Sequence, residues 1–455
     1  MTEKTRVLFV PGFFSSADKG CVDKYLADAK AVLGKVDVDY IETSPLSDLD
    51  SVAAVREQAG ANNYDAVLLY LISWVDTNVV VDLFNGLKNK PCVIWGVDYF
   101  MSEGKKTHLG ALAALLPMKG ALEEMGIGHS CLYGNPDKAG LPEELAAILD
   151  AARTVTALMQ ARIGMVGYAA LGMYPGMVNP LRVKKLLGTE IIPIDNYTLI
   201  SQCEANRKDE ALLRGTESLK DKFNLLDPIS TEDQNTCIAM EEAIRQLIAQ
   251  HGLSAITLRC CFELASDFGF APCVPISALS DECVTSCESD IPVTLTQLIL
   301  HNLAAKPAPY VDIMLMDEFR IYFACCGFGA FEYARDGDKR IAYSHTSECK
   351  NEFSFGRVIN TSRYEDGVYT LARLNLPLEA GPSMQVIAGE NRNDFEAFYE
   401  FGCKEYPSLG LTVKQPTAQI MEKLTSQHFA LVKGDLTEKL RLFCRFTQIE
   451  WDVLS

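Results

Sequence analysis

The 455-residue chain lacks the short motifs that identify many enzyme classes directly. It contains no GxGxxG or P-loop signature after a predicted strand, no GxSxG nucleophile elbow and no HExxH pair among its six histidines. These absences argue against the common dinucleotide and nucleotide sites, the α/β-hydrolases and the zincins. The glycine-rich run from Gly164 to Met177 is therefore interpreted as tight turns rather than as a phosphate cradle.

Positive charge is also scarce. The chain has 42 Lys and Arg against 60 Asp and Glu, a formal charge of -18, and no long basic run. Phosphate binding needs clustered cations, so nucleic acid is not an expected partner. No stretch reaches the roughly 18 to 20 apolar residues that span a bilayer, and the start MTEKTRVLFVPGFF lacks a secretory layout. The sequence predicts a cytoplasmic protein without a membrane partner.

The fifteen cysteines form no CxxC pair, and four of them are adjacent in twos, Cys260-Cys261 and Cys325-Cys326. Adjacent cysteines are poorly suited to separate disulfides. We expect reduced, mostly buried thiols and no structural zinc site.

Continuous apolar strands alternate with helical patterns through the first 160 residues, and this indicates a parallel sheet with both faces covered. The predicted strands are 6–10, 36–41, 66–72 and 91–95, and the predicted helices lie near 22–33, 51–57, 79–87 and 109–125. After a helix at 142–159 the pattern restarts with strands 163–166, 190–194 and 255–260 and helices 181–187 and 231–251.

Beyond residue 306 the strands become short and closely spaced, which is typical of an antiparallel sandwich or barrel. They are predicted at 311–316, 320–325, 340–343, 353–359, 368–371, 384–387 and 429–432, with a final helix at 436–446. The predicted fold is α/β, with two parallel-sheet domains at 1–160 and 161–305 followed by a β-rich, barrel-like domain at 306–455.

Acidic residues concentrate where the second α/β unit joins the β-rich part. Glu263, Glu282, Glu288 and Asp290 fall within 28 residues. If the CESD segment is extended, Glu288 and Asp290 point to the same side. Such oxygen ligands suit Mn²⁺ or Mg²⁺, and one imidazole favours Mn²⁺ or a neighbour in the series. The alternatives are an N-cap for Asp290, which precedes Pro292, and a solvated helix position for Glu263.

The stretch from Thr257 to His301 resembles the L-fucose isomerase family. The shared features are a Cys-aromatic start, Gly-x-x-x-Cys, a Leu-x-Asp-Glu turn and Cys-Glu-x-Asp opening a helix. RIGMVGYAALGMYPGM (162–177) resembles the start of that family's middle domain, and residues 426–451 resemble its closing His-x-x-x-x-x-Gly-Asp segment. The resemblance is distant and spreads over most of the chain.

This resemblance implies a divalent-metal sugar isomerase with Mn²⁺, or Mg²⁺ or Co²⁺, as cofactor. It makes Glu263 the catalytic carboxylate and a metal ligand, Asp290 the second catalytic carboxylate and ligand with Glu288 as the alternative, and His428 the imidazole ligand. Otherwise His428 would be interpreted as a surface residue at a strand start. The resemblance places Trp74 where the family has an aromatic near the sugar, in the site of its own or of a neighbouring subunit; the alternative is an ordinary core position. The family also implies a homo-oligomer, a trimer or hexamer.

Two departures from the family's pattern leave the identity of the sugar substrate open. Cys325-Cys326-Gly327 stands where relatives often carry His-Cys-Gly, and the loop GFFSSADKG lacks an Arg that some relatives direct at the substrate. The prediction is an aldose–ketose isomerase that acts through an ene-diol. The alternatives are an isomerase or epimerase of a modified or anionic sugar, whose charge Arg259 could bind unless it is structural, and a sugar-binding protein without activity. A hydrolase or lyase using the same ion is a weaker option.

Overall fold

A computed structural model describes residues 4–102, 104–325, 327–343, 357–392 and 408–454, without the side chains of residue 102 and residues 261–263. The chain groups into two compact units. One contains Met1–Ala157 and Glu438–Ile449, and the other contains Leu158–Thr437 and Glu450–Ser455. The division into three domains stays a prediction.

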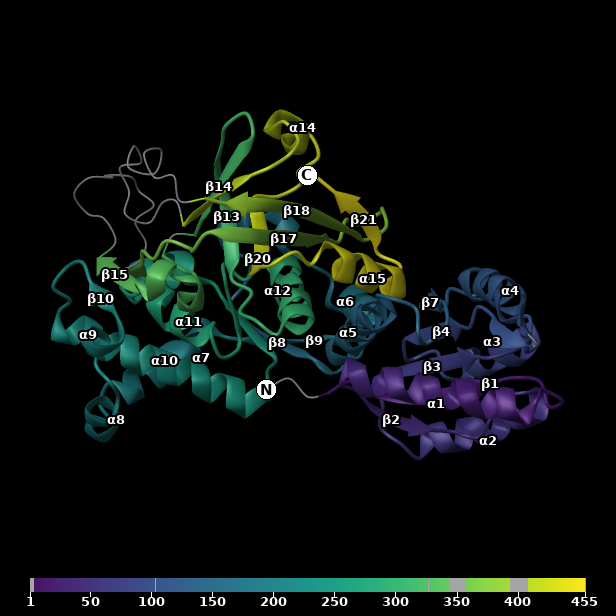
Figure 1. The fold of residues 1–455 in the computed structure, drawn as a ribbon. Coiled ribbons are helices and arrows are strands. Elements are labelled where there is room, and N and C mark those ends of the chain that lie inside the picture. Colours follow the sequence, from purple (N-terminus) through teal and green to yellow (C-terminus); the bar gives the residue numbers. More distant parts are fainter. Residues whose placement is uncertain (1–3, 103, 326, 344–356, 393–407, 455) are drawn as a thin grey trace. The chain divides into compact units, whose positions relative to one another are not determined.

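The first unit is built on a five-stranded parallel sheet in the order β2-β1-β3-β4-β7 (Figure 1). The central strands form because they are continuous runs of buried apolar residues, such as AVLLYL in β3, that can be covered on both faces. The strands are β1 (Arg6–Gly12), β2 (Asp39–Glu42), β3 (Ala66–Leu71), β4 (Cys92–Gly96) and β7 (His129–Tyr133), with a hairpin of β5 (Phe100–Ser102) and β6 (Lys105–Thr107). The helices are α1 (Lys19–Val36), α2 (Leu49–Gly60), α3 (Thr77–Gly86), α4 (Ala111–Glu124), α5 (Leu141–Gln160) and α15 (Thr437–Thr447). The division between the two units falls within the last two helices.

Two details of this sheet differ from the sequence prediction. The strand expected at 36–41 starts later, because Val36 still belongs to α1 and the turn at Asp37 has φ 58°. No strand is predicted at His129–Tyr133, because this short segment begins with two polar residues. It nevertheless forms the fifth strand of the sheet.

The second unit begins with a four-stranded parallel sheet in the order β12-β11-β8-β9. Its strands are β8 (Arg162–Val166), β9 (Glu190–Ile194), β11 (Ala255–Leu258) and β12 (Val284–Cys287). Its helices are α6 (Pro180–Leu187), α7 (Asn196–Asn206), α8 (Glu210–Gly215), α9 (Leu219–Lys222), α10 (Thr231–His251), α11 (Cys273–Leu279) and α12 (Ile291–Ala304). It also has two short 3₁₀ turns, η1 (Ala170–Gly172) and η2 (Tyr174–Gly176), and one π-helix, η3 (Cys260–Asp267).

The remainder of the second unit is a β-rich sheet that closes into a ring. The strand order is β17-β20-β13-β14-β19-β18, and β18 pairs back with β17, while β21 joins β18 in parallel. The ring encloses a core of alternating apolar side chains that includes Phe323, Leu371 and Phe429. The strands are β13 (Tyr310–Met316), β14 (Arg320–Ala324), β17 (Gly367–Asn375), β18 (Ser383–Asn391), β19 (Leu409–Thr412), β20 (His428–Lys433) and β21 (Glu450–Val453), and α14 spans Thr417–Met421. A smaller sheet holds β10 (Asn224–Leu225), β15 (Arg340–Tyr343) and β16 (Val358–Asn360).

The fold class predicted from the sequence is thus confirmed, with two parallel α/β sheets followed by a β-rich, barrel-like sheet. The strand predicted at 353–359 lies partly outside the described residues, whose strand β16 starts at Val358. The buried helix α12 packs on β20 and β17 of the ring and on β11 and β12 of the parallel sheet (Figure 1). It therefore joins the two sheets of this unit.

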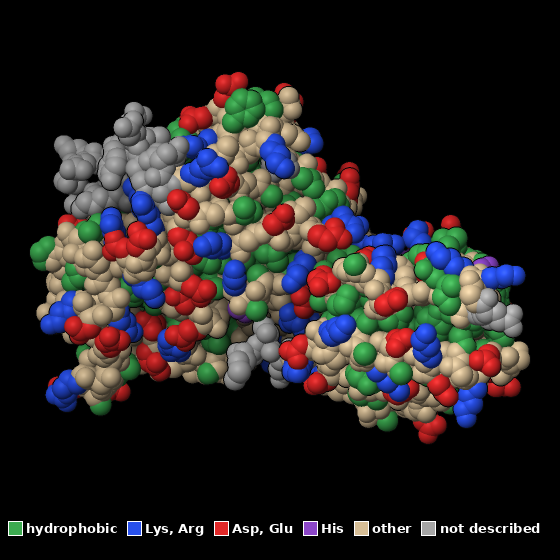
Figure 2. Space-filling model, viewed as in Figure 1, with side chains coloured by type: hydrophobic (Ala, Val, Ile, Leu, Met, Phe, Trp, Pro, Cys, Tyr) green, Lys and Arg blue, Asp and Glu red, His purple; other side chains and the backbone are tan. Residues whose placement is uncertain are grey.

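The charged surface and the state of the described cysteines are those that the composition predicts. Acidic and basic side chains are intermixed over the surface that Figure 2 shows. The cysteine side chains that the structure describes are free thiols, and most of them are buried. Among the described residues, no helix is both long and apolar enough to cross a membrane.

Candidate active site

The candidate site lies at the carboxyl end of β12, where parallel α/β sheets usually bind their ligands. The chain leaves this strand through Glu288 and Ser289, which both adopt the left-handed region with φ 61° and 53°. The CESD segment is therefore not extended, so the strand alternation that would place Glu288 and Asp290 on one side does not apply. The turn is held by Ser289, whose hydroxyl donates to the carbonyl of Val166 at 3.0 Å.

Asp290 starts helix α12 directly after this turn. Its Oδ1 accepts a hydrogen bond from the backbone N–H of Val293 at 3.0 Å, and Pro292 occupies the first turn, where its missing N–H costs nothing. The N-cap interpretation of Asp290 is confirmed. The cap uses only one carboxylate oxygen, so the other one remains for a second contact.

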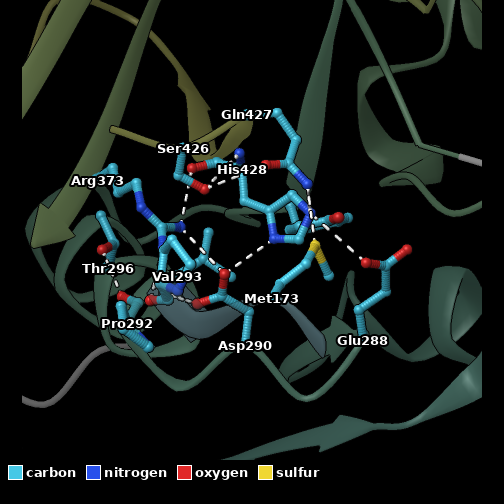
Figure 3. Close-up of polar contacts among 12 residues, drawn as sticks. Met173, Glu288, Asp290, Pro292, Val293, Thr296, Arg373, Ser426, Gln427 and His428 are labelled. Atoms are coloured by element: carbon cyan, nitrogen blue, oxygen red, sulfur yellow. Dashed lines mark hydrogen bonds and ion pairs between the residues drawn. The ribbon is translucent and has the colours of Figure 1, made fainter. Parts of the chain in front are cut away.

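That second oxygen contacts His428 at the start of β20. Oδ2 of Asp290 lies 2.9 Å from Nδ1 of His428 and 3.1 Å from Nη1 of Arg373 in β17 (Figure 3). The three residues are at most 1 % exposed. His428 is therefore buried, contrary to its interpretation as a surface residue.

The other ring nitrogen of His428 faces a different set of polar groups. Its Nε2 lies 3.1 Å from Oδ1 of Asp312, 3.5 Å from Oε2 of Glu288 and 2.9 Å from the side-chain amide of Gln427. Figure 3 shows Arg373 and Asp290 on one side of the imidazole and Glu288 on the other. One imidazole thus contacts three carboxylates, and the Arg373 guanidinium contacts one of these, Asp290.

Antiparallel pairing explains how Asp312 reaches this position. Asp312 in β13 lies directly opposite His428 in β20. Tyr310 precedes it by two residues and so shares its face; the Tyr310 hydroxyl donates to Oδ1 of Asp312 at 3.0 Å. The Tyr310 ring packs edge-on against His428 with centroids 4.7 Å apart. The strand pair therefore fixes the imidazole plane.

The charges in this cluster shift its pKa values in opposite directions. Burial alone would lower the pKa of His428, but the hydrogen bonds and charges of Asp290 and Asp312 raise it to about 9. Burial and the nearby Cys260 and Asp312 raise the pKa of Glu288 to about 8. Burial disfavours the charged form of Asp290, yet the Arg373 guanidinium and His428 hold its pKa below the ordinary value. Such perturbed groups are typical of functional sites.

The sequence-predicted residues are only partly brought together. Glu288, Asp290 and His428 meet in one cluster, whereas Glu282 lies apart and pairs with Arg245 at 2.5 Å. Arg259 follows β11 at the same edge of the sheet and is half-buried. Glu263 belongs to η3, but its side chain lies outside the described residues. Trp74 belongs to the first unit, is 42 % exposed and donates from Nε1 to Asp76 at 2.8 Å.

The sequence reasoning missed Arg373, Asp312 and Tyr310. The signal for Arg373 was a lone cation inside the apolar strand LARLN, since a fully buried Arg needs a charged partner. The signal for Tyr310 and Asp312 was weaker, because YVDI reads equally well as an ordinary alternating strand.

The donor types of the cluster, carboxylate oxygens and an imidazole, are those that a hard divalent cation takes. Within the described side chains, however, no group of three or more His, Cys, Asp or Glu residues is arranged to hold a metal ion as it stands. The metal site therefore stays a prediction.

Comparisons with known proteins point to one kind of enzyme. The chain is 25 % identical over 457 aligned residues, covering 99 % of both chains, to sulfoquinovose isomerases of Priestia aryabhattai and Priestia megaterium. It is 26 % identical to a sulfoquinovose isomerase of Alkalicoccus urumqiensis over 77 % of each chain. The chain is thus a distant, full-length homologue of sugar isomerases.

No protein-family model matches the chain. Among solved structures, a XylFII molecule matches 68 % of the chain at 11 % identity with a TM-score of 0.18, which is too low to indicate a shared fold.

Proposed function

We propose that the protein is an isomerase of an anionic monosaccharide, with a sulfonated sugar as the first candidate substrate. The observation that carries the proposal is the similarity to sulfoquinovose isomerases over 99 % of both chains. The buried cluster of His428 and three carboxylates at the carboxyl edge of a parallel sheet supports it, because isomerisation needs groups that move a proton and stabilise charge.

In this proposal the reaction is an aldose–ketose exchange. A carboxylate removes the proton from C2 of the open-chain aldose, and the electron pair forms the C1–C2 double bond of the ene-diol while O1 takes up a proton. The carboxylic acid then returns its proton to C1 while O2 gives up its hydroxyl proton, which yields the ketose. Glu263, which follows β11 in η3, is the proposed base. One acid of the CESD segment, Asp290 or Glu288, faces it across the sugar. Proton shuttling by a positioned carboxylate contributes roughly 10²- to 10⁴-fold to the rate.

The proposed cofactor is Mn²⁺ or another divalent cation such as Mg²⁺ or Co²⁺. Glu263, His428 and the acid of the CESD segment would hold it. When bound, such an ion polarises the sugar oxygens and stabilises the negative charge of the ene-diol. His428 is itself buried, so its contacts lie away from bulk water.

Arg259 is the proposed partner of the anionic substituent. It stands directly after β11, and its backbone N–H donates to Val166 of the neighbouring strand at 2.9 Å, which fixes its start at the ligand edge of the sheet. A guanidinium presents paired donors that match a sulfonate or carboxylate. Trp74 is proposed to contact the sugar from a neighbouring subunit of a homo-oligomer.

The test is a ketose-formation assay with sulfoquinovose and with neutral pentoses and hexoses, before and after chelation and with Mn²⁺ added back. We expect turnover of the anionic sugar that chelation abolishes and Mn²⁺ restores. Turnover of neutral sugars alone would contradict the anionic substrate, and turnover that resists chelation would contradict the cofactor. Sugar binding without turnover on any substrate would identify a non-catalytic sugar-binding protein instead.

A further inference from the structure

Loops from three neighbouring strands meet at the carboxyl end of β8, beside the His428 cluster. In the order β12-β11-β8-β9, the chain leaves β8 toward β9 on one side and leaves β11 toward β12 on the other. Parallel α/β sheets usually bind their ligands at such a reversal of the strand order. The carbonyl of Val166 connects this point to the cluster, because it accepts from the backbone N–H of Arg259 at 2.9 Å and from the hydroxyl of Ser289 at 3.0 Å.

Gly167, the first residue after β8, makes room there for two side chains. Its φ of 79° lies in the left-handed region that favours glycine. A Cβ at this position would come within 2.9 Å of Cβ of Arg259 and within 2.9 Å of Oδ1 of Asn196, closer than a real Cβ tolerates. Arg259 follows β11 and Asn196 opens α7 after β9, so side chains from both flanking strands converge over the end of β8.

Asn196 carries a hydrogen-bond acceptor that the described part of the chain leaves unused. Its Oδ1 is shielded from solvent and has no donor among the described residues, although the residue as a whole is only half-buried. A buried acceptor without a donor is costly, so native proteins retain few of them and each one calls for a reason. The hydroxyl groups of a sugar are donors of the kind that this oxygen lacks.

We infer that Asn196 is a specificity-determining residue of the proposed active site, where its Oδ1 accepts a hydrogen bond from a sugar hydroxyl beyond the two reacting carbons. Arg259 lies against the same glycine, so the two side chains recognise a hydroxylated chain and its anionic substituent at one place. A site built in this way rejects analogues without the hydroxyl, because Oδ1 then stays buried and unpaired. The inference rests on the proposed function, since it takes the substrate to be a sugar.

The test compares steady-state kinetics of the native protein and Asn196→Leu on the sugar that the native protein isomerises. Leu is close to Asn in shape but has no acceptor, so KM should rise about 10-fold while kcat stays within about 2-fold of the native value. The matched control is Asn62→Leu, at an exposed position after α2, which should alter neither constant.

Monodeoxy analogues that lack the hydroxyl at C3, C4 or C5 add a readout that a merely structural role would not move. With one of them the native protein should lose at least about 10-fold in kcat/KM, and Asn196→Leu should lose nothing further. Equal losses in native protein and variant for all three analogues would overturn the inference and leave the isomerase intact.

A native protein that isomerises no sugar would overturn the proposed function and the inference together. A crystal structure of the native protein with its sugar decides the question even if Asn196→Leu does not fold. The inference requires a sugar hydroxyl within hydrogen-bonding distance of Oδ1 of Asn196, and a bound sugar that leaves this atom without a hydroxyl would overturn it.

Discussion

Asp290 and His428, 138 positions apart in the chain, are joined by a 2.9 Å contact between Oδ2 and Nδ1. The same oxygen accepts from Arg373, so the contact belongs to a buried network in which a carboxylate is shared by two cationic partners. Removing one member leaves the others charged and buried, which is costly.

Arg373→Met should therefore destabilise the protein by about 3–5 kcal/mol, because it leaves the buried Asp290 without its guanidinium. The free energy of unfolding in urea measures this loss. The control is Arg392→Met, which removes an exposed pair with Glu390 and should change stability by less than about 1 kcal/mol. Equal effects of the two substitutions would mean that the buried network does not hold the site together.

Stability of the metal-free protein should fall as the pH rises from 6.5 to beyond 9. The pKa of His428 is raised to about 9 in the folded state, so its contribution is fully present below the unfolded value of about 6.5 and is lost as the pH passes 9. The loss amounts to at most about 3 kcal/mol. Glu288, with its pKa raised to about 8, acts in the same direction.

Urea unfolding in chelating buffer at several pH values tests this dependence. His428→Gln cannot titrate and should show a flatter decline over the same range. A decline as steep as that of the native protein would show that His428 does not carry the effect.

The fold class could be predicted because its signals are local. Continuous apolar strands such as β3 allow only a sheet covered on both faces, and short alternating strands after residue 306 favour an antiparallel one. Ring closure, by contrast, depends on the pairing of β17 with β18 and of β18 with β19, which no local pattern encodes.

The site was predictable only where the resemblance supplied it. Asp290 looked like a helix cap and proved to be one, and nothing local indicated that its second oxygen meets His428. Asp312 and Arg373 join the cluster through strand register and a buried ion pair. Tertiary packing determines these contacts, so the spacing of residues along a single sequence does not reveal them.

Glu263→Gln should reduce kcat by about 10²- to 10⁴-fold, since the amide cannot take the proton from C2. The ketose assay at saturating sugar and Mn²⁺ measures this change. Glu282→Gln is the matched control in the same segment, because Glu282 pairs with Arg245 away from the His428 cluster. A fully active Glu263→Gln enzyme would require another base.

Arg259→Met should raise KM for a sulfonated sugar by about 10- to 100-fold, the usual worth of a hydrogen bond to a charged group, and should leave KM for any neutral substrate unchanged. Arg162→Met, at the opposite, amino end of β8, is the control and should alter neither value. A rise in KM for charged and neutral sugars alike would indicate that Arg259 supports the loop rather than recognises the anion.

Trp74 lies in the first unit, on a different part of the chain from His428, and the proposal assigns it to the site of a neighbouring subunit. If so, Trp74→Ala and His428→Ala proteins should each be poorly active, and hetero-oligomers formed from both should regain activity. The reason is that some mixed interfaces then combine an intact Trp74 from one subunit with an intact His428 from the other. Activity measured after co-refolding, with the assembly size checked by light scattering, tests this. Mixed oligomers that stay inactive would show that Trp74 does not act across a subunit boundary, since only a shared site permits such complementation.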